Sequence, residues 1–475
     1  MTITGRATPA PTGPEKLATQ IARRLEEEII ERGWPVGEIL GTEAELREQF
    51  GVSRSVLRES IRLLEHHHVA RMRRGPSGGL EVCVPDVSPA TRALVIYLEY
   101  VGTSIEDLLR ARQLLEPLAA RLTADRLTEE GVEQLRAKMR RERSRTEDPT
   151  SADFHVLLAR LSGNAVLQLF VAVLARLTSR YAQTSQRTSK SAVEAARTAA
   201  IDRHAEIVEA VIAGDAAAAQ TRLGAHLDEL GAWLLAHRVR RPSPRMRSRP
   251  ADPDPDDDNG RKLAEVVAGR MHDDIVSDGL QVGAVFGAES DLLTRYGVSR
   301  AVLREAIRIL EHHSVARMRR GNGGGLVVLA PDPTASIHTM ALYLDCQGMS
   351  PDDLGAVREV IELGCVQAVS TTMPSPEAAS RLCASLDRTG EDGFGDLFHT
   401  ELADLTGNPV LTLFLRITTE LWAGHGRTDP SAVLVPATDL RHVHGKIVDA
   451  VLAGDEALAQ HRMRRHLRNL PALWH

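Results

Sequence analysis

Apolar residues near the start of the chain recur at every fourth position. Leu17, Ile21, Leu25 and Ile29 follow this spacing, which places them on one face of an amphipathic helix. The glycine and proline residues within 33–37 then end the helix. The pattern therefore predicts one amphipathic helix at the start of the first domain.

Two more helices and a β-hairpin are predicted downstream. Thr42 precedes Glu45 by three residues, which is the arrangement of a capping box at a helix start. Ser53 can cap a third helix, whose apolar positions again share one face. Residues 69–74 and 80–84 are predicted to form a hairpin with a glycine-rich tip. Two helices joined by a turn and followed by such a hairpin indicate a winged helix-turn-helix domain.

The chain contains this pattern twice. Residues 51–75 recur at 297–321 with 21 of 25 positions identical, at an offset of 246 residues. A weaker similarity continues downstream, where residues 208–227 recur at 448–467. The repeating unit is about 230 residues long, which is far longer than a solenoid repeat. The sequence is therefore a duplication of a two-domain protein.

The repeats set the predicted domain boundaries and the fold class. The second part of each unit shows helical periodicity with little strand signal, so the fold is expected to be mainly α, with two winged helix-turn-helix domains alternating with two all-α bundles. The junction between units is a basic Pro/Ser run followed by an acidic Pro/Asp run, which indicates a solvated linker, with a DNA-touching tether as the alternative. We predict a disordered segment at 1–13, winged domains at 14–86 and 261–331, helical domains at 87–238 and 332–475, and a linker at 239–260.

Composition narrows the class of protein. No apolar stretch reaches the ~20 residues that span a bilayer, and the N-terminus lacks the apolar core of a secretory signal. The four cysteines show no CxxC spacing, which fits a reducing compartment. We therefore expect a soluble, cytoplasmic protein with no membrane partner. The net charge of the whole chain, −6, argues against binding to nucleic acid. A net value can hide local basic regions, so the distribution of charge along the chain must decide whether the protein binds nucleic acid.

Arginine is concentrated in the third helix and the hairpin. Arg54, Arg58 and Arg62 are spaced four apart and form one stripe along the helix, and three more arginines follow within 71–74. The planar guanidinium can bind guanine edges or phosphates through two hydrogen bonds. A solvated helix face is the alternative, but the helix-turn-helix and the hairpin favour DNA. The second copy repeats all six: Arg300, Arg304, Arg308, Arg317, Arg319 and Arg320.

The run GTEAEL, followed by GVSRSVLRESIRLLEHHHVARMRRG, resembles the winged-helix domain of GntR-type bacterial regulators. Together with a helical effector domain, it resembles the FadR subfamily, over nearly the whole chain and twice. The resemblance implies a transcriptional repressor that binds a double-stranded DNA operator and responds to a small organic acid. The DNA contacts that it implies are Ser53, Arg54, Ser55, Arg58, Arg74 and Gly75, with Ser299, Arg300, Arg304, Arg320 and Gly321 in the second copy.

The chain departs from the family pattern at two places. An arginine usually follows the glutamate that opens the second helix, and Ala44 and Ser290 stand there. The family glycine before the wing is replaced by His68 and Ser314. The first departure removes one usual DNA contact, which is compatible with a different operator.

Three histidines recur across the duplicated helical domains. His155, His204 and His226 correspond to His399, His444 and His466, and the last two lie 22 residues apart in each copy. Neutral imidazoles from separate helices can bind one divalent metal ion. Ordinary buried histidines are the alternative.

The resemblance implies that these histidines, with one aspartate, hold zinc, nickel or manganese. The family places the aspartate four residues before the first histidine, where Ser151 and Gly395 stand. Asp153 lies two residues before His155, and Asp396 lies three before its histidine. Three residues keep a side chain on roughly the same helix face and two do not, so Asp396 is the better candidate.

Other polar residues in the helical domains have two interpretations. Arg112 and Arg358 each precede a glutamate by four residues, and the resemblance implies that they contact the effector. A surface ion pair is the alternative. Asn164 and Asn408 each follow a glycine and are expected to be helix caps.

Two DNA-binding domains in one chain predict a pseudo-dimer on two half-sites. The half-sites would lie about 34–36 Å apart, one turn of DNA. A chain that also forms a homodimer would carry four such domains. A metal-dependent hydrolase is the alternative, but no HExxH or GxSxG motif is present, so we expect no enzyme.

Overall fold

The computed structural model of the chain divides after residue 86 into two compact units, Met1–Asp86 and Val87–His475, which are described separately. The residues that it describes are 17–67, 69–75, 78–85, 88–144, 153–183, 189–236, 263–312, 314–319, 321, 324–330, 332–372, 375–388, 396–428 and 437–469.

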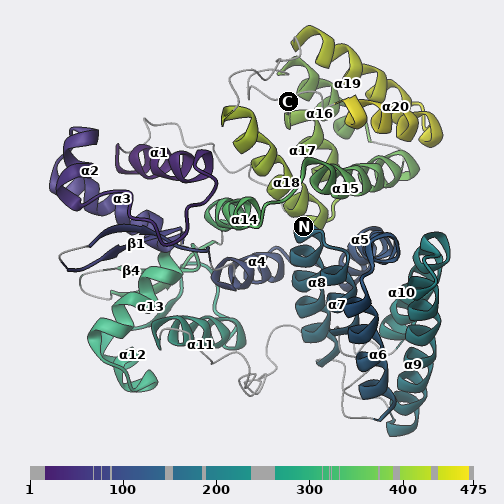
Figure 1. The fold of residues 1–475 in the computed structure, drawn as a ribbon, viewed down its shortest axis with the longest axis horizontal. Helices are drawn as coiled ribbons and strands as arrows, with labels where there is room; N and C mark the ends of the chain where they lie inside the picture. Colours follow the sequence, from purple (N-terminus) through teal and green to yellow (C-terminus); the bar gives the residue numbers. More distant parts are fainter. Residues whose placement is uncertain are drawn as a thin grey trace. The chain divides into compact units, whose positions relative to one another are not determined.

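The first unit contains winged domain 1, residues 17–85. Its first helix buries Ile21, Leu25 and Ile29, three of the four residues predicted to share the apolar face, whereas Leu17 at the start of the helix is exposed. This face packs against the third helix, which buries Leu57 and Leu64. The elements are α1 (Leu17–Glu31), α2 (Glu43–Phe50), α3 (Arg54–His66), β1 (Ala70–Arg73) and β2 (Gly79–Val82) (Figure 1).

The predicted caps of α2 and α3 are confirmed. The backbone N–H of Thr42 donates to Oε2 of Glu45 at 2.8 Å, and the N–H of Glu45 donates to the Thr42 hydroxyl at 3.3 Å. Gly51 ends α2 in the left-handed conformation, with φ of 62°. The Ser53 hydroxyl accepts from the N–H of Val56 at the start of α3. The tight turn between α2 and α3 therefore follows from local sequence.

The second unit contains helical domain 1 (88–236), winged domain 2 (263–330) and helical domain 2 (332–469). Helical domain 1 consists of α4 (Ser88–Tyr100), α5 (Ile105–Arg126), α6 (Glu129–Arg143), α7 (Asp153–Leu161), α8 (Ala165–Gln183), α9 (Lys190–Ile212) and α10 (Ala216–Ala236). Winged domain 2 consists of α11 (Leu263–Ser277), β3 (Val285–Gly287), α12 (Glu289–Tyr296), α13 (Arg300–His312), β4 (Ala316–Arg319) and β5 (Gly325–Val328). Helical domain 2 consists of α14 (Thr334–Cys346), α15 (Pro351–Thr372), α16 (Pro376–Asp387), α17 (Asp396–Leu405), α18 (Pro409–Thr428), α19 (Ala437–Leu452) and α20 (Glu456–Asn469).

The wings are antiparallel hairpins, as predicted, but the sheet is larger in winged domain 2. There β3 joins the hairpin to give the order β3-β5-β4, and the sequence had not predicted this strand. Winged domain 1 has only an isolated bridge at the same place, between Ile39 and Glu81. A glycine is required at position 79, beside this bridge, because a Cβ on residue 79 would lie 2.4 Å from Cγ2 of Ile39.

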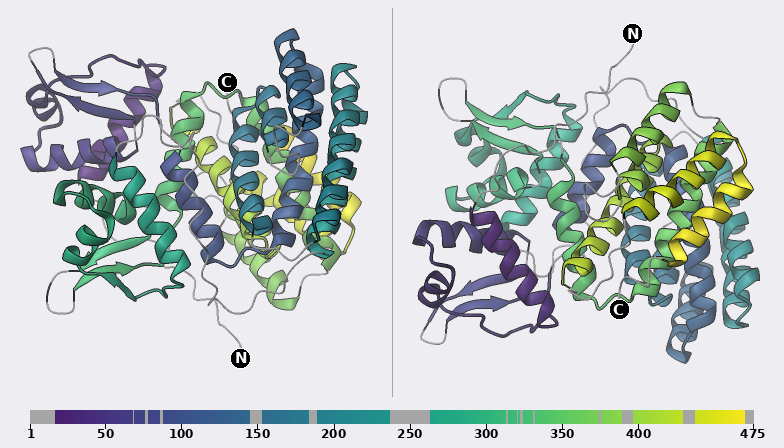
Figure 2. Two further views of the ribbon diagram at one scale, coloured as in Figure 1. Left: turned by 90° about the horizontal axis from the view of Figure 1, so that it is seen from below. Right: turned by 90° about the horizontal axis from the view of Figure 1, so that it is seen from above.

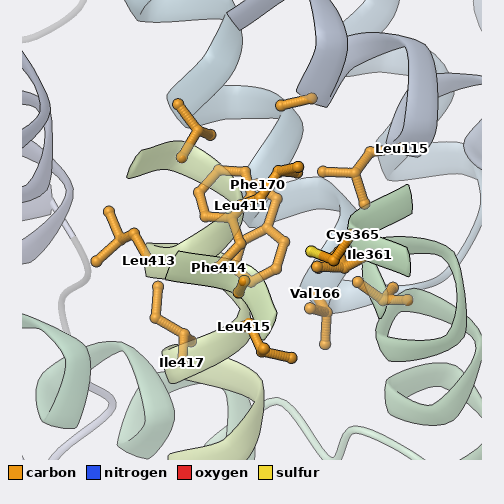
Figure 3. Packing of buried hydrophobic residues seen from close by; sticks show 14 of the residues in the cluster. Leu115, Val166, Phe170, Ile361, Cys365, Leu411, Leu413, Phe414, Leu415 and Ile417 are labelled. Carbon is orange, nitrogen blue, oxygen red and sulfur yellow. The ribbon is translucent and has the colours of Figure 1, made fainter. Parts of the chain in front are cut away.

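The two helical domains share one hydrophobic core, and their helices lie side by side in Figure 2. Helix α5 packs against α15 and α18, and α4 packs against α14. Phe170 of α8 and Phe414 of α18 hold equivalent positions in the two repeats, and their rings stack with centroids 3.9 Å apart (Figure 3). Stacking of equivalent residues places them on a pseudo-twofold axis.

Two reciprocal hydrogen bonds reinforce this symmetry. The side-chain amide of Asn164 donates to the carbonyl oxygen of Asp353 at 2.9 Å, and that of Asn408 donates to the carbonyl oxygen of Asp107 at 3.0 Å. Asn164 also caps α8, because its Oδ1 accepts from the N–H of Leu167. The expected caps are confirmed, whereas the contacts between domains were not predicted.

The mainly α fold is confirmed, with small sheets confined to the winged domains among the described residues. In the same part of the chain, no helix is both long and apolar enough to cross a membrane. The segment predicted to be disordered at 1–13 and the linker at 239–260 lie outside the described residues.

Candidate DNA interface and metal centres

The predicted DNA-contacting arginines of winged domain 1 lie exposed on the first turns of α3. Nε of Arg54 donates to Oε1 of Glu43 at 2.7 Å, and Nε of Arg58 donates to the same oxygen at 3.0 Å. Hydrogen bonds from these two arginines lower the pKa of Glu43 below its usual value. Glu43 opens α2, so it holds the two guanidinium groups side by side at the turn. This role of Glu43 was not predicted from the sequence.

The serines of the same turn have different partners in the two copies. The hydroxyl groups of Ser53 and Ser55 lie 2.9 Å apart in winged domain 1. Ser299 caps α13 by accepting from the N–H of Val302, and Ala301 replaces the second serine. The predicted serines therefore lie at the helix start in both copies, with one hydroxyl fewer in the second.

The arginines of winged domain 2 are arranged more loosely. Nε of Arg304 lies 3.4 Å from Oε1 of Glu289, the residue equivalent to Glu43. Arg300 is exposed at the start of α13. Both arginines therefore present their remaining N–H donors near the surface, where a phosphate or base could accept them.

The wing tips carry the remaining predicted DNA contacts. Arg74 is exposed, and Gly75 follows it with φ of 117°. Gly321 has an equivalent φ of 103° in the second wing. A side chain would strain the backbone at these positive φ values, so glycine permits the tight tip. Arg320 and His68 lie outside the described residues.

The first histidine cluster forms from three helices of helical domain 1. His155 of α7, His204 of α9 and His226 of α10 are buried, and one ligand atom from each lies within 4.8 Å of the others. Nδ1 of His204 lies 2.9 Å from Oε2 of Glu142. Nδ1 of His155 lies 2.7 Å from Oε2 of Glu116. The angles at this contact do not meet those of a hydrogen bond.

The second cluster is tighter. Nε2 of His466 lies 3.2 Å from Nε2 of both His399 and His444. A tetrahedral zinc ion with Zn–N bonds of about 2.0–2.1 Å holds its nitrogens about 3.4 Å apart. Nε2 of His466 carries either one hydrogen or one lone pair, so it can form only one good hydrogen bond with its two neighbours. The spacing of the three Nε2 atoms therefore fits a cation held between them.

Burial favours the neutral form of four of these histidines, which is the form that binds metal. Burial lowers the pKa of His226 and His444 to about 2 and that of His466 to about 3, so these rings are neutral at physiological pH. Burial also lowers the pKa of His204. Nε2 of His204 and Nδ1 of His444 are buried without a hydrogen-bond partner in the described structure. The donor set therefore fits a divalent metal ion in each helical domain.

A buried arginine and glutamate orient one histidine in each cluster. Nε of Arg112 donates to Glu116 at 2.6 Å, and Nε of Arg358 donates to Glu362 at the same distance. The second oxygen of Glu362 contacts Nδ1 of His399, as that of Glu116 contacts His155. A carboxylate at Nδ1 leaves Nε2 for the metal.

The ion pairs of Arg112 and Arg358 form with the expected i,i+4 spacing, but they are buried. Arg112 is 1% exposed and Arg358 is 3% exposed, so the pairs do not lie on the surface, and the contact with an effector stays a prediction. Burial would raise the pKa of Glu116 and Glu362, but the neighbouring arginine and histidine outweigh it and lower both to about 2. The glutamates are therefore ionised acceptors.

The aspartates remain apart from the clusters, as far as their side chains are described. The side chain of Asp153 is 73% exposed and lies 3.9 Å from Nζ of Lys138. Asp396 opens α17, but its side chain is outside the description. Lys138 is itself buried beside Glu142, at 3.5 Å. Sequence reasoning missed this pair, because its i,i+4 spacing is the same as that of surface pairs.

Comparison with known proteins assigns both parts of each unit. The profile described as bacterial regulatory proteins, gntR family, matches residues 17–78 and 263–325, and that of the FCD domain matches 107–229 and 353–469. The chain belongs to the gntR family of bacterial regulatory proteins. It carries the GntR and FCD domains twice.

Relatives of this GntR chain are named as regulators of transcription. The Uxu operon regulator of Haemophilus influenzae is 33% identical over 31% of this chain, which spans only about half of that relative (56%). The Exu regulon transcriptional regulator of Escherichia coli is 29% identical over 34% of the chain and 62% of its own length. The putative L-lactate dehydrogenase operon regulatory protein of Escherichia coli is 29% identical over 44% of the chain and 84% of its own length.

A solved Streptococcus agalactiae GntR structure, 24% identical, covers 46% of this chain and 99% of its own, with a TM-score of 0.34.

Proposed function

We propose that this GntR chain is a ligand-controlled repressor that binds a two-half-site operator as a single-chain pseudo-dimer. Each winged domain takes one half-site, and the two FCD domains pair within the chain. The reciprocal bonds from Asn164 and Asn408, around the stacked Phe170 and Phe414, carry this proposal. Such contacts are typical of the twofold interface of a homodimer.

The charge distribution supports DNA as the partner. The chain is acidic overall, yet the first turns of α3 and α13 carry exposed arginines in both copies. The N-terminal part of a recognition helix is where base edges are contacted in the major groove. Glu43 holds Arg54 and Arg58 as a preformed pair of guanidinium groups in winged domain 1, and Glu289 contacts Arg304 in winged domain 2.

The proposed effector is a small organic acid that binds beside a divalent metal. Zinc, nickel or manganese would be held by the three histidines of each FCD domain, and the ion would supply a positive charge for a carboxylate. Arg112 and Arg358, which bind their glutamates from within the helical domains, are the residues that we propose to contact the acid. The L-lactate dehydrogenase operon named for one relative supports this class of effector.

The DNA proposal is tested by selecting bound sequences from a random duplex pool. The variants are Arg54→Ala with Arg58→Ala, Arg300→Ala with Arg304→Ala, and Arg110→Ala as a control on the exposed surface of α5. We expect the parent and the control to select a motif of two half-sites, and each double variant to lose one half.

A motif lost entirely in only one double variant would contradict reading by both winged domains. Failure of the parent to enrich any motif would contradict sequence-specific binding.

The metal proposal is tested by equilibrium dialysis with zinc alone. We expect two zinc ions per chain, with one lost in His204→Asn, one lost in His444→Asn and none lost in His461→Asn, an exposed histidine of α20. Binding that is equal in all four proteins would exclude the histidine clusters as the sites.

A further inference from the structure

Helix α5 of helical domain 1 and α15 of helical domain 2 meet at an unusually close contact. A Cβ at Gly364 would lie 2.4 Å from Cδ1 of Leu114, 2.9 Å from its Cδ2 and 3.3 Å from its Cγ. Real side chains do not approach so closely, so the leucine occupies the space that any larger residue at 364 would need. Leu114 and Gly364 therefore fit each other as a knob and a hole.

The knob and the hole do not recur in the other copy. By the offset of 246 residues, Val360 is equivalent to Leu114, and Leu118 is equivalent to Gly364. The pseudo-twofold axis that relates the asparagine bonds brings Val360 towards Leu118, as it brings Leu114 towards Gly364. One helix thus contributes two leucines, and the other contributes a valine and a glycine.

Pairing of like domains would break this complementarity. Two copies of helical domain 1 would bring Leu114 of one against Leu118 of the other, which overfills a space that now holds a glycine. Two copies of helical domain 2 would set Val360 against Gly364 and leave a void lined by apolar atoms. Only the unlike pair fills the interface without overlap.

We propose that Leu114 and Gly364 specify pairing of helical domain 1 with helical domain 2, and so select the chain's own second half as the partner. The inference rests on the proposed single-chain pseudo-dimer. Two chains could also pair through unlike domains, but the covalent connection raises the effective concentration of the internal partner.

One ion pair favours the pairing of like domains instead. Arg126 pairs with Asp353 at 2.8 Å, whereas the residue equivalent to Arg126 is Thr372. A like pair of helical domain 1 would gain this ion pair twice, through Asp107. The arginine side chain is 41% exposed, and exposed ion pairs contribute little. The steric fit of the half-buried Leu114 against the buried Gly364 therefore outweighs it.

The test uses the full chain and one matched control. Gly364→Leu fills the hole with leucine, which is the residue at the equivalent position of helical domain 1, Leu118. Gly355→Leu lies on the same helix, where a Cβ would meet nothing within 4 Å. Leu114→Ala combined with Gly364→Leu nearly restores the volume of the contact. We measure the thermal unfolding midpoint and the mass by light scattering.

We expect the parent to have the mass of one chain, 51.8 kDa. Gly364→Leu should lower the unfolding midpoint and shift the mass upwards as the opened interfaces associate, while Gly355→Leu keeps both parent values. The double variant should recover the parent mass and most of the midpoint.

A Gly364→Leu chain that matches Gly355→Leu, or one that Leu114→Ala does not rescue, would overturn the knob-and-hole proposal and leave the pseudo-dimer standing. A parent with the mass of two chains would overturn the single-chain pseudo-dimer itself.

Discussion

At the scale of single residues, the chemistry of the histidine clusters follows from burial. An imidazole that loses water without gaining a carboxylate becomes harder to protonate. His226, His444 and His466 are in this situation, whereas His155 and His399 each face an ionised glutamate. The second cluster therefore combines neutral ligands with one ring whose orientation is fixed by a carboxylate, and in the first cluster Glu142 also orients His204.

This arrangement predicts that the metal-free protein loses stability in mild acid. Unfolded histidines titrate near pH ~6.5, whereas folded His226 and His444 titrate near 2. Below pH ~6.5 the unfolded chain binds protons that the folded chain does not, so the free energy of unfolding falls by at most ~1.4 kcal/mol per pH unit for each such histidine. Urea unfolding in a chelating buffer between pH 7 and 5 measures this slope.

The control for this prediction is His226→Asn, which should flatten the slope. Glu116 and Glu362, with pKa values of about 2, stabilise the fold above pH ~4.5 and lose this effect only below it. The window from pH 6.5 to 4.5 therefore reports on the histidines. An equal slope in the variant would contradict the assignment.

At the scale of elements, the two winged domains show which helix ends the sequence could predict. The capping box of α2 is local, so Thr42 and Glu45 were sufficient to place it. Strand β3 was missed because it is three residues long and depends on pairing with β5, far away in the chain. The buried pair of Lys138 and Glu142 was missed for the same reason, since its environment is set by distant helices.

The helix α12 lacks the cap that α2 has. Ala288 stands at its N-cap without a side-chain hydrogen bond, where Thr42 caps α2. Thr42→Ala should therefore destabilise winged domain 1 by about 1 kcal/mol, and Ala288→Thr should stabilise winged domain 2 by a similar or smaller amount. Hydrogen exchange of the amides in α2 and α12 measures the two effects separately.

The serine at the next helix provides the comparison for this prediction. Ser55→Ala removes a hydroxyl that caps nothing, so it should leave the stability of winged domain 1 within about 0.5 kcal/mol of the parent. A loss equal to that of Thr42→Ala would mean that the cap has no special effect.

At the scale of the whole molecule, the duplication was readable from the sequence, but the fit between the copies was not. Identical segments at a constant offset showed two units directly. The contacts between helical domains depend on pairs such as Asn164 with Asp353 and Leu114 with Gly364, which are more than 180 residues apart. No local pattern marks either residue as part of an interface.

The histidine clusters could be predicted from the sequence only in part. Recurrence across the repeats predicted the three histidines of each set, and the structure brings each set together. The spacing of Arg112 and Glu116 could not distinguish a surface pair from a buried one. The choice depends on the helices that cover α5, which the sequence around the pair does not reveal.

The reciprocal but unequal interface has a genetic consequence. In a regulator assembled from two identical chains, every codon change appears in both halves of the complex and must be tolerated on both sides of the axis. Here Asn164 and Asn408, or Leu114 and Val360, are encoded separately, so a change enters one side alone. Under the proposed function, one winged domain can therefore adapt to a changed half-site, or one FCD domain to a new effector, while the other copy keeps its original recognition.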